Sequence, residues 1–137
     1  MPNQKDRVVV DTNLWISFLL TKNYSKLDIL FSQNRLLLIF SQELIEEFIE
    51  VVQRPKLKKY FTLSDLQGLL MKIREKAIFI AVSSKVNICR DSKDDFLLAL
   101  AKDGKATHLI TGDKDLLDIK LFGKTKIITI AEYLTNN

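Results

Sequence analysis

The sequence has few of the residues that build specialised scaffolds. Its 137 residues include one cysteine, one histidine, two prolines and four glycines. One cysteine excludes an internal disulfide framework and is typical of proteins in a reducing cytoplasm, where we expect this chain. One histidine and one cysteine supply no zinc site. The glycines match neither Gly-x-Gly-x-x-Gly nor Gly-x4-Gly-Lys-Ser/Thr, so the chain lacks the phosphate cradles of dinucleotide-binding and P-loop proteins.

Long hydrophobic runs are also missing. The apolar run within residues 35–41 is far shorter than the roughly 20 residues that a membrane-spanning helix needs, and the polar N-terminal segment lacks the core of a secretory signal. We therefore expect a soluble protein that makes no use of a membrane. With 47% hydrophobic and 28% charged residues, the composition is that of an ordinary globular protein, and we expect a single domain over residues 1–137.

Short apolar strands alternate with helical segments along the chain. We expect strands at residues 7–11, 36–40, 107–111 and 126–130, and helices at 14–20, 24–31, 41–53, 62–77 and 92–102. We also expect a loop at 54–61, a strand or helix end at 78–82, a loop at 85–90, a helical turn at 113–118 and a short last helix capped by residues 129–132. Strands without polar alternation indicate a parallel sheet covered on both faces, so the fold class is α/β.

Acidic residues cluster in a protein whose net charge is +4, and seven of its seventeen acids lie between residues 91 and 118. Asp11 ends the first expected strand, Asp113 follows the strand at 107–111, and Asp94 and Asp95 open a helix. Ligands of parallel sheets bind beyond the carboxyl ends of the strands, so we expect these carboxylates to meet there. Each also has a purely structural explanation, as a helix cap, a dipole partner or an Asx turn.

A glutamate of the helix at 41–53 is a further candidate. At about 100° per residue, Glu47 stands roughly 120° from the centre of the apolar stripe and borders the core. Glu46 is the second choice, on the other flank. Several carboxylates in one place repel each other unless they are protonated or bridged by cations, and an all-oxygen ligand set favours Mg²⁺ or Mn²⁺.

Four segments together resemble the motifs of PIN-domain proteins, most closely the toxin components of toxin–antitoxin systems. They are VVVDTN at 8–13, residues 41–47, RDSKDD at 90–95 and ITGDKDLL at 110–117, in the family's order. The resemblance covers essentially the whole chain. It implies a three-layer α/β/α fold with a central, mainly parallel sheet, and cleavage of single-stranded RNA with Mg²⁺ or Mn²⁺.

The resemblance also implies which residues act. The acids that would hold the metal and carry catalysis are Asp11, Glu47, Asp95 and Asp113. Asp91 and Asp94 compete with Asp95 for one position, and Asp115 is a possible partner of Asp113. Asn13 and Thr111 would orient ligands or substrate, although a role as turn or cap residues is about as well supported.

The expected partners are single-stranded RNA and a small antitoxin protein, with homodimerisation left open. Basic residues that could bind RNA phosphates lie in the loop at 54–61, namely Arg54, Lys56, Lys58 and Lys59, with Tyr60 or Phe61 available for base stacking. An ordinary solvated turn explains this loop equally well. Two other functions stay open: a catalytically silent RNA- or protein-binding module, and a receiver-like signalling domain, which would show adjacent acids after the first strand, where this chain has Thr12 and Asn13.

Overall fold

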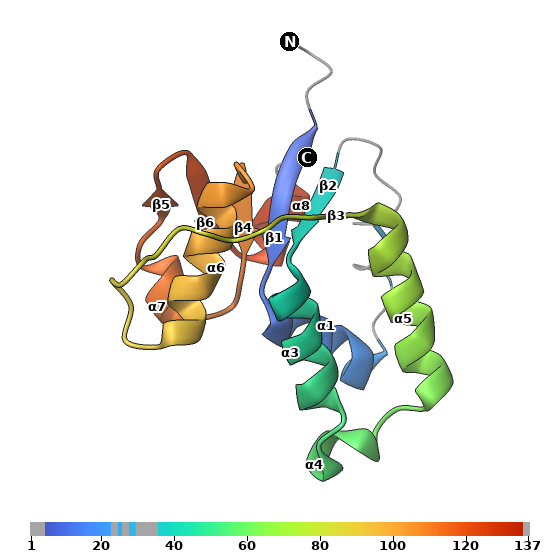
Figure 1. Ribbon diagram of the computed structural model, residues 1–137. Helices are drawn as coiled ribbons and strands as arrows, with labels where there is room; N and C mark the ends of the chain where they lie inside the picture. The colour runs from blue at the N-terminus through green and yellow to red at the C-terminus, as the bar shows by residue number, and fades with distance from the viewer. Residues whose placement is uncertain (1–4, 23–24, 26–27, 30–35, 136–137) are drawn as a thin grey trace.

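A six-stranded sheet forms the centre of the protein (Figure 1). The computed structural model describes residues 5–22, 25, 28–29 and 36–135. The strand order is β3-β2-β1-β4-β6-β5. The strands are β1 (Asp6–Val10), β2 (Leu36–Phe40), β3 (Ala77–Phe79), β4 (His108–Ile110), β5 (Leu121–Phe122) and β6 (Thr125–Ile128). Every neighbouring pair is parallel except β5 and β6, so the α/β fold class with a mainly parallel sheet is confirmed.

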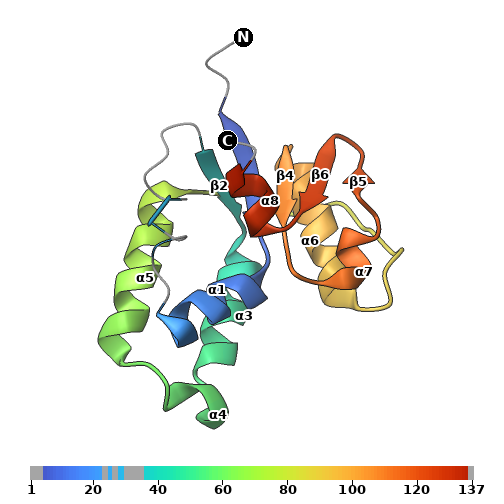
Figure 2. The ribbon, with the colours of Figure 1, turned by 180° about the vertical axis from the view of Figure 1, so that it is seen from behind.

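Helices cover both faces of this sheet. They are α1 (Thr12–Thr21), α3 (Gln42–Val52), α4 (Pro55–Lys58), α5 (Leu63–Lys76), α6 (Ser92–Asp103), α7 (Lys114–Leu117) and α8 (Ile130–Thr135). Helix α6 lies over the face nearest the viewer in Figure 1, and α8 lies over the face nearest the viewer in Figure 2. Two capping boxes begin helices as expected, between Thr62 and Asp65 and between Thr129 and Glu132. No helix in the described ranges is long and apolar enough to cross a membrane.

The structure differs from the sequence-based expectations at three places. The loop expected at 54–61 contains the short helix α4, because Pro55 suits the first turn of a helix. The last parallel strand ends at Ile128, and the hairpin of β5 and β6 was not expected. β3 covers only residues 77–79 of the region assigned as the end of a helix and a possible strand. Most of the helix expected at 24–31 lies outside the described residues and stays a prediction.

The core lies where the central strands meet the helices on each side. Val8, Val9 and Val10 of β1 are fully or almost fully buried, as are Leu38 and Ile39 of β2. A strand buried on both faces needs apolar residues at every position, which explains why these strands lack polar alternation. This packing fixes the carboxyl ends of β1, β2 and β4 at one edge of the sheet.

Gly104, at the end of α6, tests how tightly α6 packs on the sheet. A Cβ atom there would lie 2.5 Å from Cγ2 of Ile39 in the buried strand β2. We expect Gly104→Ala to lower the free energy of unfolding by about 1–3 kcal/mol, because the core cannot make room. Gly68→Ala is the matched control, since its Cβ would meet nothing within 4 Å. In α5 that change should stabilise by about 0.5–1 kcal/mol. Urea denaturation measures both, and equal effects would contradict this packing.

Candidate active site

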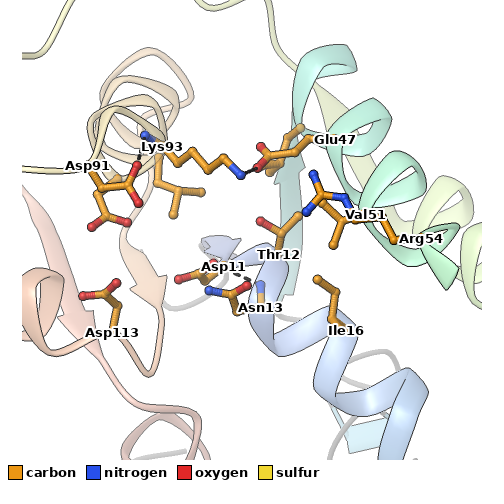
Figure 3. A pocket seen from close by; sticks show the side chains of 13 residues that line it. Asp11, Thr12, Asn13, Ile16, Glu47, Val51, Arg54, Asp91, Lys93 and Asp113 are labelled. Atoms are coloured by element: carbon orange, nitrogen blue, oxygen red, sulfur yellow. Dashed lines mark hydrogen bonds and ion pairs between the residues drawn. The ribbon is translucent and has the colours of Figure 1, made fainter. Parts of the chain in front are cut away.

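A polar pocket of about 250 Å³ lies at the edge where β1 and β4 end. We call it the acid pocket (Figure 3). Its lining residues come from the β1–α1 junction, α3, the start of α6 and the β4–α7 connection; they are Asp11, Thr12, Asn13, Ile16, Leu44, Glu47, Val51, Arg54, Asp91, Lys93, Asp94, Leu97 and Asp113. The topology rule for parallel sheets thus locates the pocket correctly.

Asp11 lies at the junction between β1 and α1, with only 5% of its surface exposed. Its Oδ1 accepts a hydrogen bond from the Asn13 N–H at 3.1 Å, which caps α1. Its Oδ2 accepts one from the Thr111 hydroxyl at 2.8 Å. Burial raises the pKa of Asp11, and nearby Asp113 and Glu47 raise it further, while the two hydrogen bonds oppose this shift. Asp11 therefore both caps a helix and faces the other acids.

Thr111 joins the ends of two neighbouring strands. Its hydroxyl donates to Asp11 and accepts the Asp113 N–H at 3.0 Å. Asp113 in turn caps α7, because its Oδ1 accepts the Asp115 N–H at 2.8 Å. The cap uses one carboxylate oxygen, and the other accepts no hydrogen bond from any described residue. Thr111 thus orients Asp11, although it does not line the pocket itself, and its role toward a ligand or substrate stays a prediction.

Asp94 is the acid whose environment most clearly calls for a cation. It is 6% exposed and lines the acid pocket, yet its carboxylate makes no hydrogen bond or ion pair with any described residue. Burial, with Asp113, Asp91 and Asp11 nearby, raises the pKa of Asp94 to about 6. A buried carboxylate among like charges is unfavourable unless it is protonated or meets a cation.

Asp95, the first choice from the sequence, does not line the acid pocket. Its Oδ1 accepts the N–H groups of Ile88 and Cys89 at 3.0 and 2.8 Å, and these bonds hold its pKa below the usual range. Consecutive helix positions differ by about 100°, so Asp94 faces the pocket while Asp95 fastens the preceding loop. Of the two acids, Asp94, one of the alternates, lines the pocket and Asp95 does not, so which of them binds a metal stays a prediction. Asp91, the other alternate, lines the pocket and caps α6 by accepting the Lys93 N–H.

Glu47 enters the pocket from α3, as its position beside the apolar stripe predicts. Its carboxylate forms an ion pair with Lys93 of α6 at 3.2 Å, and this contact crosses the pocket in Figure 3. Glu46 is exposed and accepts a hydrogen bond from Gln42 instead. Lys93 was missed by the sequence analysis, although it lies between two acids that line the pocket. Lys93 and Arg54 are the two basic residues that line the pocket.

The remaining predicted residues lie at or outside the rim. Asn13 lines the pocket with an exposed side chain. Asp115 pairs with Arg90 at 2.8 Å and does not line the pocket. Of the basic residues predicted to bind RNA, Arg54 lines the pocket, whereas three lie outside it on the exposed α4 segment, namely Lys56, Lys58 and Lys59. Their RNA-binding role stays a prediction.

Comparison with known proteins agrees with this architecture. The family model of the PIN domain matches residues 7–115, a range that contains every residue lining the acid pocket. The chain belongs to the PIN-domain family. PIN domains are generally metal-dependent nucleases. The chain is also 31% identical over 124 residues to the uncharacterized protein MJ1680 of Methanocaldococcus jannaschii, a match that covers 88% of this chain and 79% of that protein.

The acids of this PIN domain suit a hard divalent cation in their chemistry. Carboxylate oxygens are the ligands that Mg²⁺ and Mn²⁺ prefer, and the carboxylate of Asp94 lines the pocket without a partner among the residues that the structure describes. Within the described ranges, however, no three His, Cys, Asp or Glu side chains are arranged so that they could hold a metal ion as they stand. The caps of Asp91 and Asp113 and the ion pair of Glu47 hold the carboxylates around the pocket rather than at one point. Binding would therefore require side-chain rotation.

The adjacent residues Asp94 and Asp95 should respond to pH with opposite signs. Because the folded-state pKa of Asp94 is raised, its contribution to stability is lost as pH rises from about 4 to about 6. Without metal, Asp94→Asn should therefore be more stable than the wild type above that window, by on the order of 1–3 kcal/mol, and should lose this advantage at low pH. Denaturant titrations across this pH range provide the measurement.

Asp95→Asn is the matched control for this experiment. The lowered pKa of Asp95 means that its charged form stabilises the fold above the usual aspartate pKa, and that this contribution disappears as pH falls. The variant should therefore be less stable than the wild type near neutral pH. If Asp94→Asn also lost stability there, Asp94 would not be the strained acid of the pocket.

Proposed function

We propose that this PIN domain is a divalent-metal-dependent ribonuclease that cleaves single-stranded RNA at the acid pocket. The observation that carries the proposal is Asp94, a buried residue whose carboxylate faces the pocket near Asp11 and Asp113 and has no hydrogen bond or ion pair with any described residue. The matched family supports the same chemistry, because its members are generally nucleases. The proposed ligands are Asp11, Asp94 and Asp113, with Glu47 reaching the site from α3 and Asp91 at its rim.

The residues of the chain have distinct tasks in this proposal. Thr111 holds the Asp11 carboxylate in place, and the caps of α1 and α7 orient Asp11 and Asp113. Mg²⁺ or Mn²⁺, when bound, supplies the positive charge that offsets these acids and the Lewis acidity that activates water for in-line attack on phosphorus. No side chain needs to act as the nucleophile.

Two cations at the pocket suit the substrate. Lys93 and Arg54 both line it, and a phosphodiester that enters among the carboxylates needs positive charge on its other side. Lys93 is held at the pocket by its ion pair with Glu47, and its ammonium group keeps further N–H donors with which to contact phosphate. We propose that these two residues position the scissile phosphate, and that Lys56, Lys58 and Lys59 extend the contact along the RNA backbone.

Cleavage of single-stranded RNA by the purified protein tests the proposal. We expect Asp11→Asn to abolish cleavage with Mn²⁺, because it removes a charged ligand while an amide can still accept the bond that caps α1. Asp113→Asn should reduce cleavage, more mildly, and a chelator should stop the wild type. Asp118→Asn is the control, since Asp118 is an exposed acid outside the pocket and should keep full activity. Full activity of Asp11→Asn at saturating Mn²⁺ would overturn the assignment.

Thermal melts, compared with cleavage assays, distinguish a nuclease from a catalytically silent binding module. Metal that binds only the folded state stabilises it by about 2.7 kcal/mol at a hundredfold excess over Kd. An active enzyme should show both a Mn²⁺-dependent rise in Tm and cleavage, and Asp11→Asn should lose most of both. A rise in Tm without cleavage of any single-stranded RNA would favour a catalytically silent module that uses the metal structurally.

We also propose that the protein is the toxin of a toxin–antitoxin pair, on the strength of its motif resemblance. This role requires a partner that keeps the nuclease inactive. We expect the neighbouring gene to encode a small DNA-binding protein with a flexible tail, and expect that protein to bind this chain and suppress cleavage. The gene neighbourhood and a pull-down with the neighbour's product test this role. A neighbour of another kind that does not bind would contradict it.

A further inference from the structure

A second hollow lies at the opposite edge of the sheet from the acid pocket. Its volume is about 710 Å³, and it is formed by the end of α6, the start of β4 and the hairpin of β5 and β6. The lining residues are Ala101, Lys102, Lys105, Ala106, Thr107, Phe122, Gly123, Lys124 and Thr125. We call it the lysine groove. In Figure 1 the end of α6 lies toward the top, away from the β1–α1 junction.

The backbone around the lysine groove is held in place by hydrogen bonds. Arg7 Nε donates to the Gly104 carbonyl at 2.8 Å, and the Thr125 hydroxyl donates to the Ala106 carbonyl at 2.7 Å. Gly123 has a φ of +59° at the first position of the two-residue hairpin loop, a conformation that glycine adopts without strain. The turn therefore holds the backbone of Lys124 in a defined conformation. The shape of the groove follows from the fold.

The lysines of the groove form no ion pair with any described residue, which holds for Lys102, Lys105 and Lys124. Asp103 is the adjacent acid in the chain and its charge acts on Lys102, but its carboxylate is turned to the Ser83 and Ser84 N–H groups and the Ser84 hydroxyl, from which it accepts hydrogen bonds. One acid therefore offsets only part of the charge of three lysines. Three unpaired cations around one groove favour an anionic occupant.

The substrate of the proposed function is such an anion. The acid pocket carries negative charge, so its carboxylates repel the phosphates of RNA, and much of the binding free energy must come from basic surfaces elsewhere. Phe122 adds a half-buried aromatic ring to the lining of the groove. Basic grooves with an aromatic side chain are typical of surfaces that bind single-stranded nucleic acid.

We propose that the lysine groove binds the phosphate backbone of single-stranded RNA outside the segment held at the acid pocket. This inference rests on the proposed ribonuclease function. Helix α6 contributes to both sites, and its Lys93 at the acid pocket and Lys102 at the groove are roughly 14 Å apart along the helix axis. A dinucleotide held in the acid pocket is too short to reach Lys102, whereas a long strand can occupy both sites.

Charge reversal at two different places distinguishes RNA binding by the lysine groove from a general effect of the protein's net charge. The test variant is Lys102→Glu/Lys105→Glu/Lys124→Glu. The control, Lys72→Glu/Arg74→Glu/Lys76→Glu, makes the same change of charge on the exposed face of α5, where it also breaks the exposed ion pair of Lys72 with Asp28, a contact of the kind that contributes little to stability. Binding of long polyuridylate is measured in chelator, without cleavage, at several salt concentrations. The groove variant should bind more weakly, and the slope of log K against log salt should become shallower by about 0.7 for each lost phosphate contact.

Two further measurements keep the outcome clear. Mn²⁺-dependent cleavage of a dinucleotide, which cannot span both sites, should be the same in the groove variant as in the wild type. The milder Lys102→Gln/Lys124→Gln variant should show a smaller shift of the same sign, which guards against misfolding of the triple variant. A polyglutamate peptide is the competing ligand, and groove-dependent binding of that peptide without groove-dependent binding of RNA would overturn the proposal in favour of an acidic protein partner.

The failure of this proposal is distinguishable from failure of the ribonuclease function. If the wild type cleaves RNA but the groove variant and the α5 control have equal salt slopes, the lysine groove does not bind RNA and the active-site proposal stands. If the wild type neither binds nor cleaves single-stranded RNA, both proposals fail together.

Discussion

The hydrogen bond from Thr111 to Asp11 is the contact on which the acid pocket depends. It joins the residues that follow two neighbouring parallel strands, and the same hydroxyl accepts the Asp113 N–H. Two acids about a hundred positions apart in the chain are therefore brought to the same edge of the sheet. The buried apolar ends of the two strands, Val8 to Val10 of β1 and Leu109 and Ile110 of β4, make this possible, because their burial fixes the height at which each strand ends.

The acids that line the pocket are, in large part, the same residues that cap helices. Asp11, Asp91 and Asp113 each accept a backbone N–H at the start of a helix, so their charges gain from the positive helix ends. These caps stabilise the fold in the absence of any metal and spread the carboxylates around the pocket. Asp94 also lies in the first turn of α6, but its carboxylate accepts no hydrogen bond from any described residue, and burial among the other acids raises its pKa to about 6.

The charges of the molecule are separated in space. Acids gather at the carboxyl edge of the sheet, balanced in part by Lys93 and Arg54, while unpaired lysines surround a groove at the other edge. A net charge of +4 describes neither region, because it averages a negative pocket and a positive groove. Such a division suits a protein that must attract a polyanion and also hold cations against it.

The sequence by itself determined the fold class, the edge of the sheet where the site lies, and the acids at strand ends, because apolar strands and the rule for parallel sheets depend only on local pattern. Helical periodicity also separated Glu47 from Glu46. It did not separate Asp94 from Asp95, since both open the same helix and a small rotation decides which one faces the pocket. The ion pair of Lys93, the shared hydroxyl of Thr111 and the lysine groove join segments that are distant in the chain, so only tertiary packing decided them.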